Sequence, residues 1–237
     1  MEETIAIVPA RGGSKSIPKK NIKDFCDKPL IAYSIEVAQA CPSITRTIVS
    51  TDSEEIAEIA KSYGAEVPFI RPKEFAQDAT LDYPVFRHCL EWLRDNENSI
   101  PEMVVQLRPT SPIRDVETIE RGIAMLRDHP TADCVRAICE PSQNPYKMWT
   151  LNKEGYVEPL IKTNIHEQYN QPRQALPVVY WQNGYLDVIR AKTILEKGSM
   201  SGDAVMGLVL SPDYVFDIDN DMTFEFAELY YKRKIDK

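Results

Sequence analysis

The sequence lacks long apolar runs and an excess of positive charge, and each absence excludes a class of protein. No stretch approaches the roughly 18–20 apolar residues of a membrane span, and the start lacks the basic and then apolar pattern of a secretory signal. We therefore expect a cytoplasmic protein with no membrane partner. Its 28 Lys and Arg stand against 36 Asp and Glu, and the net charge of -8 argues against general binding of nucleic acid.

Cysteine and histidine are few and are poorly spaced for metal binding. The five cysteines include no Cys-x-x-Cys pair, and their odd number argues against a disulfide framework. The three histidines lie far apart and have no second ligand at metal-binding spacing: His88, His129 and His166. Neither a zinc site nor a Ser/His/Asp arrangement is indicated.

Two common phosphate-binding motifs, GxxxxGK[ST] and GxGxxG, are also missing. Instead, the stretch from Ile5 to Asn21, IAIVPARGGSKSIPKKN, predicts a buried strand that ends in a basic loop with two glycines. Glycines let backbone N–H groups approach an anion, and Arg and Lys supply charge. A basic loop on an acidic chain favours a small anionic ligand over a polyanion. A solvated surface loop after an edge strand explains the same pattern.

Short apolar runs alternate with amphipathic patterns along the first 140 residues. Strands are predicted at 5–8, 47–50, 66–70, 103–107 and 132–139. Helices are predicted at 29–40, at 53–63, around Val85–Leu93, and around Ile119, Ile123, Ala124 and Leu126. This alternation predicts an α/β fold, a Rossmann-like three-layer sandwich with a mostly parallel sheet. Ligands bind such sheets beyond the carboxyl ends of the strands, in loops such as 11–21, 50–52, 71–82 and 108–114.

The pattern changes after residue 140. The stretch 141–177 is rich in Pro, Asn, Gln and Tyr, and we interpret it as an excursion from a single domain spanning 1–237. Strands are predicted again at 178–189, 205–210 and 214–218, with a short helix at 191–197. A last helix is predicted after Asp219-Asn220-Asp221, with an apolar face formed by Met222, Phe226, Leu229 and Tyr230.

Two carboxylates, Asp217 and Asp219, stand two residues apart and are predicted on one face of a strand end. Such a pair beside a phosphate ligand would hold Mg²⁺. One alternative is a plain strand end followed by a helix cap. Another is an EF-hand calcium loop with Asp221 and Glu228 as further ligands, although Met222 then replaces the glycine of that motif.

Two arginines, Arg71 and Arg108, each precede a proline at the predicted end of a strand. Arginine in a stiff loop suits bidentate recognition of phosphate or carboxylate. An ion pair with one of the many acidic side chains is the alternative.

Six motifs in a fixed order resemble one known family. They are the opening stretch, RPKEFAQD, RPTSPIR, QPRQALP, QNGYLDV and FDIDND, and they extend over nearly the whole chain. In this order they resemble the acylneuraminate cytidylyltransferases, or CMP-sialic acid synthetases, and relatives acting on other acidic sugars. The resemblance implies a fold of the nucleotide-diphospho-sugar transferase type. It also implies CMP transfer from CTP to the anomeric hydroxyl of a 2-keto-3-deoxy sugar acid, with release of pyrophosphate.

The resemblance further implies roles for individual residues. Nucleotide binding would fall to Arg11, Gly12, Gly13, Ser14, Lys15, Lys20, Asn21, Arg71 and Thr80. Catalysis would depend on Arg11, Lys15, Lys20 and Asp219. Mg²⁺ would be held by Asp217 and Asp219. Sugar binding would fall to Arg108, Thr110, Ser111, Arg173, Gln174, Gln182, Asn183 and Asp187. The excursion would be a dimerisation arm that reaches the partner's site in a homodimer.

The sequence departs from the sialic-acid enzymes at three places. Ser16 replaces a usual Gly in the opening loop, Arg108 replaces a common Gln, and Asp187 stands where a Tyr often follows Asn-Gly. The last two lie on the sugar side and should change which sugar fits, so either sialic acid or a related nonulosonic acid is the expected acceptor. A nucleotidyltransferase using a sugar 1-phosphate with CTP or GTP stays open, as do a regulatory nucleotide-binding protein and a calcium-binding module.

Overall fold

The computed structural model describes residues 3–212 and 216–235. They form a central six-stranded sheet with strand order β10-β6-β9-β5-β1-β4. The strands are β1 (Thr4–Pro9), β4 (Arg46–Ser50), β5 (Met103–Gln106), β6 (Cys134–Cys139), β9 (Trp181–Arg190) and β10 (Val205–Val209). β9 is antiparallel to β5 and β6, whereas the other neighbours pair in parallel. The prediction of a mostly parallel sheet is confirmed.

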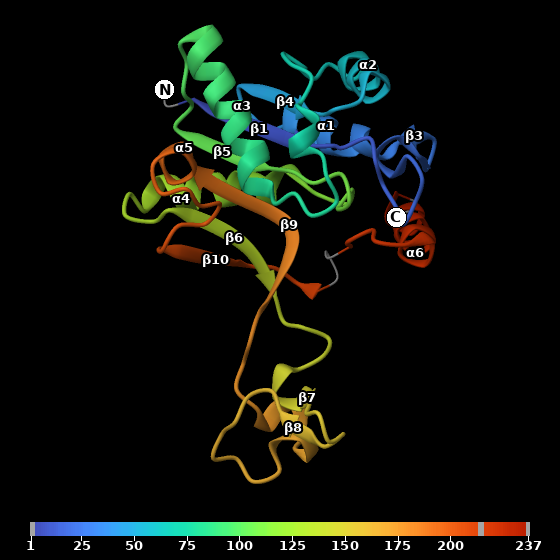
Figure 1. Ribbon diagram of the computed structural model, residues 1–237, viewed down its shortest axis with the longest axis vertical. Helices are drawn as coiled ribbons and strands as arrows, with labels where there is room; N and C mark the ends of the chain where they lie inside the picture. The colour runs from blue at the N-terminus through green and yellow to red at the C-terminus, as the bar shows by residue number, and fades with distance from the viewer. Residues whose placement is uncertain (1–2, 213–215, 236–237) are drawn as a thin grey trace.

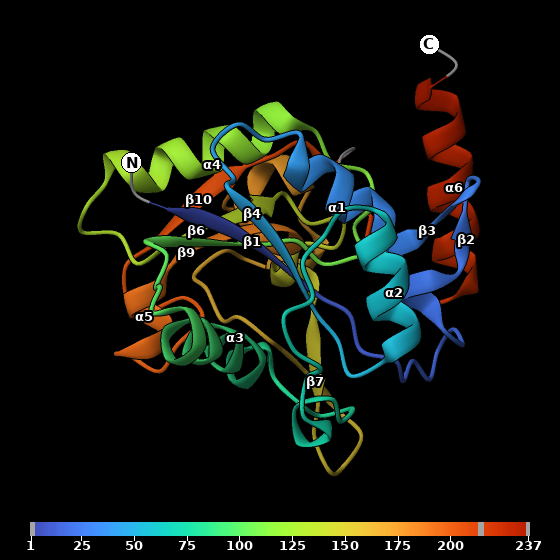
Figure 2. The ribbon, with the colours of Figure 1, turned by 90° about the horizontal axis from the view of Figure 1, so that it is seen from above.

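Helices cover both faces of the sheet, which gives three layers (Figure 2). One face packs against α1 (Leu30–Gln39), α2 (Glu54–Ser62) and α4 (Val116–Asp128). The other packs against α3 (Asp82–Glu97) and α5 (Ala191–Leu195). Strands enclosed on both sides must be apolar on both sides, which explains the unbroken apolar runs of the sequence.

Local signals begin and end these helices. The hydroxyl of Ser53 accepts from the Ile56 N–H at the start of α2, and Asp115 caps α4 in the same way. The predicted face of α4 is partly wrong, because Ala124 is exposed and Gly122 is buried instead. A Cβ at Gly122 would lie 2.7 Å from Leu186, so only glycine lets this helix approach β9 so closely.

The predicted strand at 66–70 is wrong. Only Glu66 makes a bridge to the sheet, opposite Ile48. Pro68 has no N–H to continue the ladder, and the chain returns to β4 only at Arg71, whose N–H donates to the Thr51 carbonyl at 2.7 Å. A loop therefore replaces a strand, and it carries Arg71 past the end of β4.

The stretch 141–177 projects from the body as an arm (Figure 1). A short hairpin of β7 (Trp149–Leu151) and β8 (Val157–Pro159) stiffens it, with turns η3 (Pro145–Lys147), η4 (Gln168–Asn170) and η5 (Arg173–Ala175). The arm exposes large apolar side chains, including Leu151 at 71% and Tyr156 at 72%.

The C-terminal part departs from its predicted pattern. Of the strand predicted at 214–218, Tyr214 and Val215 lie outside the described residues, and 216–218 form no strand. Asn220 caps α6 (Asp221–Ile235) by accepting from the Thr223 N–H. The predicted apolar face is wrong: Met222, Phe226 and Leu229 are 80%, 60% and 48% exposed.

The opposite side of α6 is the buried one. Phe224 and Ala227 pack with Phe25 and Leu30, near the small hairpin of β2 (Asp24–Phe25) and β3 (Lys28–Pro29). Both sides of α6 carry apolar residues, so periodicity alone did not identify the packed one. No helix among residues 3–212 and 216–235 combines the length and apolarity needed to cross a membrane.

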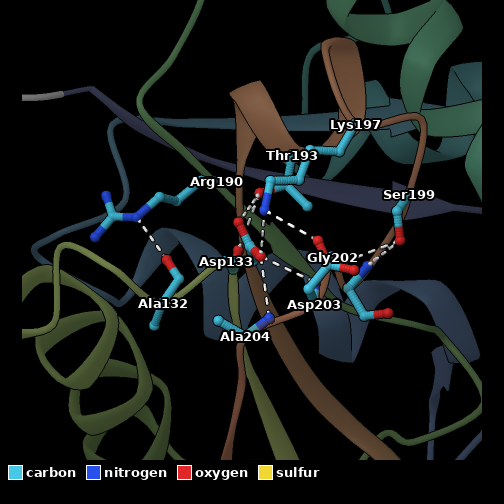
Figure 3. Close-up of polar contacts among 10 residues, drawn as sticks. Ala132, Asp133, Arg190, Thr193, Lys197, Ser199, Gly202, Asp203 and Ala204 are labelled. Carbon is cyan, nitrogen blue, oxygen red and sulfur yellow. Dashed lines mark hydrogen bonds and ion pairs between the residues drawn. The ribbon is translucent and has the colours of Figure 1, made fainter.

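At the amino end of the sheet, where its parallel strands begin, Asp133 is the centre of a polar network (Figure 3). This carboxylate is 4% exposed. It accepts hydrogen bonds from Lys197 at 2.8 Å, from the backbone N–H of Asp203 at 2.9 Å and from that of Ala204 at 3.1 Å. These donors hold the pKa of Asp133 far below its usual range, with Lys197 contributing most.

Arg190 completes the same end of the sheet. Its side chain donates to the carbonyls of Ala132 at 2.9 Å and Leu126 at 2.7 Å, and pairs with Glu102 at 2.7 Å. Every nitrogen of this buried guanidinium therefore has an acceptor, as burial of a charge requires. At this end of the sheet, the buried charges of Asp133 and Arg190 are therefore bonded to partners within the chain.

Candidate active site

A cleft of about 500 Å³ opens at the carboxyl end of the sheet. Its walls come from the opening loop, the loop 71–82, the loop after β5 and the segment before α6. The cleft is lined by these predicted site residues: Arg11, Ser14, Lys15, Lys20, Asn21, Arg71, Thr80, Arg108, Thr110 and Asp219. Four distant parts of the sequence thus meet where parallel sheets bind ligands.

The opening loop is held from two sides. The Gly12 N–H donates to Asp52 Oδ1 at 2.8 Å, and Asn21 Nδ2 donates to the Arg11 carbonyl at 2.9 Å. A Cβ at Gly12 would lie 3.1 Å from that of Ser53, so glycine lets the loop pack against the end of β4. Gly13, in contrast, has open space around it.

Asp78 joins two of the predicted phosphate-binding cations, and sequence reasoning gave it no role. Its carboxylate pairs with Arg11 at 2.9 Å and also with Lys15. The two cations, Lys15 foremost, lower the pKa of Asp78. All three side chains are substantially exposed, so these pairs contribute little to stability and exchange readily with another anion.

Lys20 connects the opening loop to the acidic segment. Its ammonium donates to the Ile218 carbonyl at 2.7 Å, between Asp217 and Asp219. Burial lowers the pKa of Lys20, and the two carboxylates oppose this effect. Burial and the neighbouring Asp219 raise the pKa of Asp217. Two carboxylates crowded in this way favour a bound cation.

Asp217 and Asp219 suit a Mg²⁺ site that substrate phosphates complete. Among residues 3–212 and 216–235 no three His, Cys, Asp or Glu side chains gather as a metal cluster. Mg²⁺ is commonly held by one or two carboxylates together with substrate phosphates, so the pair fits this ion. Asp219 lines the cleft, whereas Asp217 does not.

The EF-hand alternative is wrong. α6 begins at Asp221, inside the supposed calcium loop. Asp221 pairs with Lys23 at 3.2 Å, and Glu228 accepts from the Cys26 N–H at 3.1 Å. The proposed calcium ligands therefore face other partners.

Arg71 is 4% exposed and lines the cleft, yet two of its donors have no partner. Its Nε and Nη2 atoms are unbonded within the described part of the chain, and the nearest carboxylate, on Asp52, is 3.9 Å away. Burial lowers the pKa of Arg71, and Asp52 opposes this effect. Unsatisfied buried donors are costly, so this arginine favours a ligand with oxygen acceptors.

The loop after β5 is fixed by Arg114, another residue that sequence reasoning missed. Its guanidinium donates to the carbonyls of Tyr185 at 2.6 Å and Arg108 at 2.9 Å, and to that of Ser111. Arg108 and Thr110 therefore face the cleft on a rigid loop. Ser111 is buried beneath it and does not line the cleft.

Three predicted sugar-binding residues lie on β9 but do not line the cleft. Gln182 is exposed, Asn183 is 1% exposed, and Asp187 is 3% exposed and paired with Arg136 at 2.7 Å. Asn183 Nδ2 has no partner among the described residues. In this chain, β9 thus borders the cleft rather than forming its wall.

Arg173 and Gln174 lie apart from the cleft, in a hollow of about 290 Å³ at the base of the arm. Arg173 donates to the Pro141 carbonyl at 2.6 Å and lies 3.5 Å from a carboxylate oxygen of Glu140. Within one chain these residues do not meet the other predicted site residues.

Comparisons with known proteins identify the family of the chain. The family described as "Cytidylyltransferase" matches residues 5–228. A pseudaminic acid cytidylyltransferase of Campylobacter jejuni is 31% identical over 97% of both chains. A CMP-N,N'-diacetyllegionaminic acid synthase of Legionella pneumophila is 30% identical over 94% of both chains.

The fold is also that of a solved structure. CMP:2-keto-3-deoxy-manno-octonic acid synthetase complexed with CTP superposes with a TM-score of 0.71 at 14% identity, covering 98% of this chain and 99% of that one. The chain therefore belongs to the cytidylyltransferase family of nucleotidyltransferases, in the group of CMP-nonulosonic acid synthases.

Proposed function

We propose that this enzyme transfers CMP from CTP to the anomeric hydroxyl of an acidic 2-keto-3-deoxy sugar and releases pyrophosphate. The activities for which its relatives are named support a nonulosonic acid as the acceptor. The observation that carries the proposal is the contact of Lys20 with the Ile218 carbonyl. It joins the cationic opening loop to the two aspartates, so the groups that a nucleoside triphosphate needs meet at one wall of the cleft.

The cations of the opening loop act on the triphosphate. Nucleotidyl transfer needs positioning and neutralisation of the leaving pyrophosphate more than covalent help from the protein. Arg11, Lys15 and Lys20 supply this positive charge, with backbone support from Gly12, Gly13 and Ser14. Binding of the triphosphate would release Arg11 and Lys15 from Asp78.

The other walls position the nucleoside and a metal ion. Arg71, Asn21 and Thr80 face the ribose and cytosine, and the free donors of Arg71 suit the oxygen acceptors there. Asp217 and Asp219 would hold Mg²⁺. Once bound, Mg²⁺ supplies charge neutralisation at the phosphates and polarises the attacked phosphorus.

The acceptor sugar is placed at the other end of the cleft. Arg108 and Thr110 would face it directly, while Asn183 on the bordering strand β9 carries a buried donor that has no partner among the described residues. Ser111, Gln182 and Asp187 do not line the cleft, so they would act on the sugar through neighbouring groups.

Pyrophosphate release across a panel of nucleotides and sugars tests this function. We expect turnover with CTP and a nonulosonic acid, in the presence of Mg²⁺, and little with GTP. Activity confined to GTP and a sugar 1-phosphate would refute the assignment. Binding of CTP without turnover of any sugar would favour the regulatory alternative.

The arm is proposed to complete the site of a second subunit in a homodimer. Val178, Tyr180 and Trp181 at its base are 68%, 48% and 48% exposed, which is unusual for large apolar residues outside an interface. Arg173 and Gln174 would then reach the partner's sugar site. Sedimentation should show a dimer at micromolar concentration, whereas a fully active monomer would contradict this proposal.

The five cysteines are unpaired, which suits the proposed cytoplasmic location.

A further inference from the structure

Three polar side chains form a row across β5, β9 and β6. Gln106 stands opposite Asp187 in the register of β5 and β9, and Asp187 stands opposite Arg136 in that of β9 and β6. Directly opposed residues project to the same face of a sheet. The residues two positions earlier in β5 and β6 pack against α3, so the row lies on the α3 face.

The Arg136–Asp187 pair leaves one end of the guanidinium free. Arg136 Nε donates to Asp187 Oδ1 at 2.7 Å, and Nη2 lies 3.5 Å from Oδ2. Nη1 has no partner among residues 3–212 and 216–235. Asp187 is 3% exposed and fixes the guanidinium, while 21% of the Arg136 side chain stays exposed. A guanidinium held in this way presents its remaining donors in a set direction.

The row continues into the cleft. Gln106 Nε2 donates to Asp82 Oδ2 at 2.9 Å, and the same oxygen pairs with Arg108. Asp82 and Arg108 both line the cleft. Burial raises the pKa of Asp187, whereas Arg136 and Arg108 both lower it, so all four charged groups lie within electrostatic reach. Their charges sum to zero, which lets them stay together at the border of the cleft.

A bulge in β9 brings further donors to the same place. Between two successive pairings the chain advances by two residues on β6, from Arg136 to Ile138, but by five on β9. The extra residues include Asn183, with its unpartnered Nδ2, and Gly184, with φ +70°. A Cβ at Gly184 would lie 3.7 Å from Arg108 Nη1. Bulges beside active sites commonly re-aim side chains, and this one brings Gly184, the neighbour of Asn183 in the chain, against Arg108.

We propose that Arg136 is a specificity-determining residue that donates from Nη1 to an oxygen of the acceptor sugar, either a carboxylate or an acyl carbonyl oxygen. This rests on the proposed function, because it assigns the sugar end of the same cleft. β6 lies three strands from β1, and three strand spacings amount to about 14 Å. Arg136 therefore contacts the part of the sugar that is remote from the triphosphate.

The double variant Arg136→Met, Asp187→Leu tests this role. Removing only one partner would leave a buried charge alone, whereas an apolar pair of similar volume commonly preserves the fold. We expect the KM for the acidic sugar to rise at least roughly tenfold, because one hydrogen bond from a charged donor is lost. The KM for CTP should be unchanged. Arg136→Lys, which keeps the charge without the fork of donors, should give an intermediate KM.

Arg46→Met is the matched control. Arg46 also lies on a strand and pairs with acidic residues, Glu66 and Glu97, but its strand β4 is at the far edge of the sheet from β6. This variant should leave both KM values unchanged. Two acceptor analogues identify the oxygen: one with the carboxylate converted to a carboxamide, and one that lacks an acylamino group. The analogue that loses the contacted oxygen should bind wild type and double variant equally.

The outcomes separate the two proposals. Wild-type turnover of CTP and an acidic sugar, together with a double variant whose sugar KM stays within twofold, overturns the role of Arg136 alone. Equal rises in the KM for CTP and sugar also overturn it, because they indicate a general disturbance of the cleft. A wild-type enzyme that accepts no acidic sugar overturns the proposed function and this assignment with it.

Discussion

The two ends of the central sheet use buried polar groups in opposite ways. At the amino end, Asp133 and Arg190 are buried, and each is held by several partners. At the carboxyl end, Arg71 and Asn183 are buried as deeply but keep donors without a partner in the described part of the chain. Thr4 is an exception, with an unpartnered hydroxyl at the amino end.

This difference separates residues that stabilise the fold from residues that bind a ligand. A satisfied buried charge ties elements together, and losing one partner destabilises the protein. An unsatisfied buried donor stabilises nothing in the free protein and gains its acceptor only when a ligand enters. Substitutions at the amino end should therefore change stability, and those at the carboxyl end should change activity.

The largest expected effect is at Asp219, in the cleft. Asp219→Asn should lower kcat by roughly 10²–10³-fold, because the charge that neutralises the transition state is then poorly held. The melting temperature should not fall, since Asp219 is exposed. Asp221→Asn is the control: this carboxylate is two residues away, pairs with Lys23 and does not line the cleft. Equal activity in the two variants would refute the metal role.

At the amino end, Asp133→Asn should destabilise the protein by about 3 kcal/mol, since Lys197 and two backbone N–H donors lose a buried carboxylate partner. Urea unfolding measures this loss, and kcat at a permissive temperature should be unchanged. Asp203→Asn, whose side chain is 94% exposed and lies 3.4 Å from the same lysine, is the control and should change stability little. A large loss of activity in a folded Asp133 variant would break the separation of the two ends.

Arg71→Met should have the reverse effect of the Asp133 variant. Its lost donors should raise the KM for CTP by roughly 10- to 100-fold, the worth of one charged hydrogen bond. Stability should be kept or improved, because a desolvated and partly unpaired charge is removed. Steady-state rates at varied CTP concentration together with a melting curve measure both effects. A marked drop in stability would mean that Arg71 has a folding role.

The smallest expected effect is the pH dependence of stability. The pKa of Asp133 is lowered in the folded state, so its contribution is complete above the unfolded value of about 3.9 and is lost as the pH falls below it. Wild type should thus lose more stability than Asp133→Asn between pH 5 and pH 3, as measured by urea unfolding. Parallel curves for the two proteins would contradict this linkage.

Much of the fold could be predicted from local patterns, and the failures have physical causes. The prediction of a strand at 66–70 failed because Pro68 interrupts pairing. The prediction of the buried face of α6 failed because apolar residues occur on both of its sides. The antiparallel direction of β9 carries no local signal at all, since a buried strand has the same pattern in either direction.

Part of the cleft lining could also be predicted from local motifs. Arg11, Lys20, Arg71 and Asp219 were identifiable because their motifs are contiguous in sequence and stand at strand ends. Asp78, Arg114 and Arg136 were missed because each acts through a partner far away in the chain. Asp78 and Arg114 stood in recognised motifs, RPKEFAQD and RPTSPIR, and that signal could have found them.

The sequence by itself determined the alternation of strands and helices, and the basic loop and paired aspartates that characterise a cytidylyltransferase. These features are local, because periodicity and turn chemistry depend on near neighbours. Only the tertiary structure decided that Lys20 joins the loop to the aspartates, and that Arg136 pairs with Asp187 in one row with Gln106. Those contacts arise from strand order and register, which depend on packing across the whole sheet.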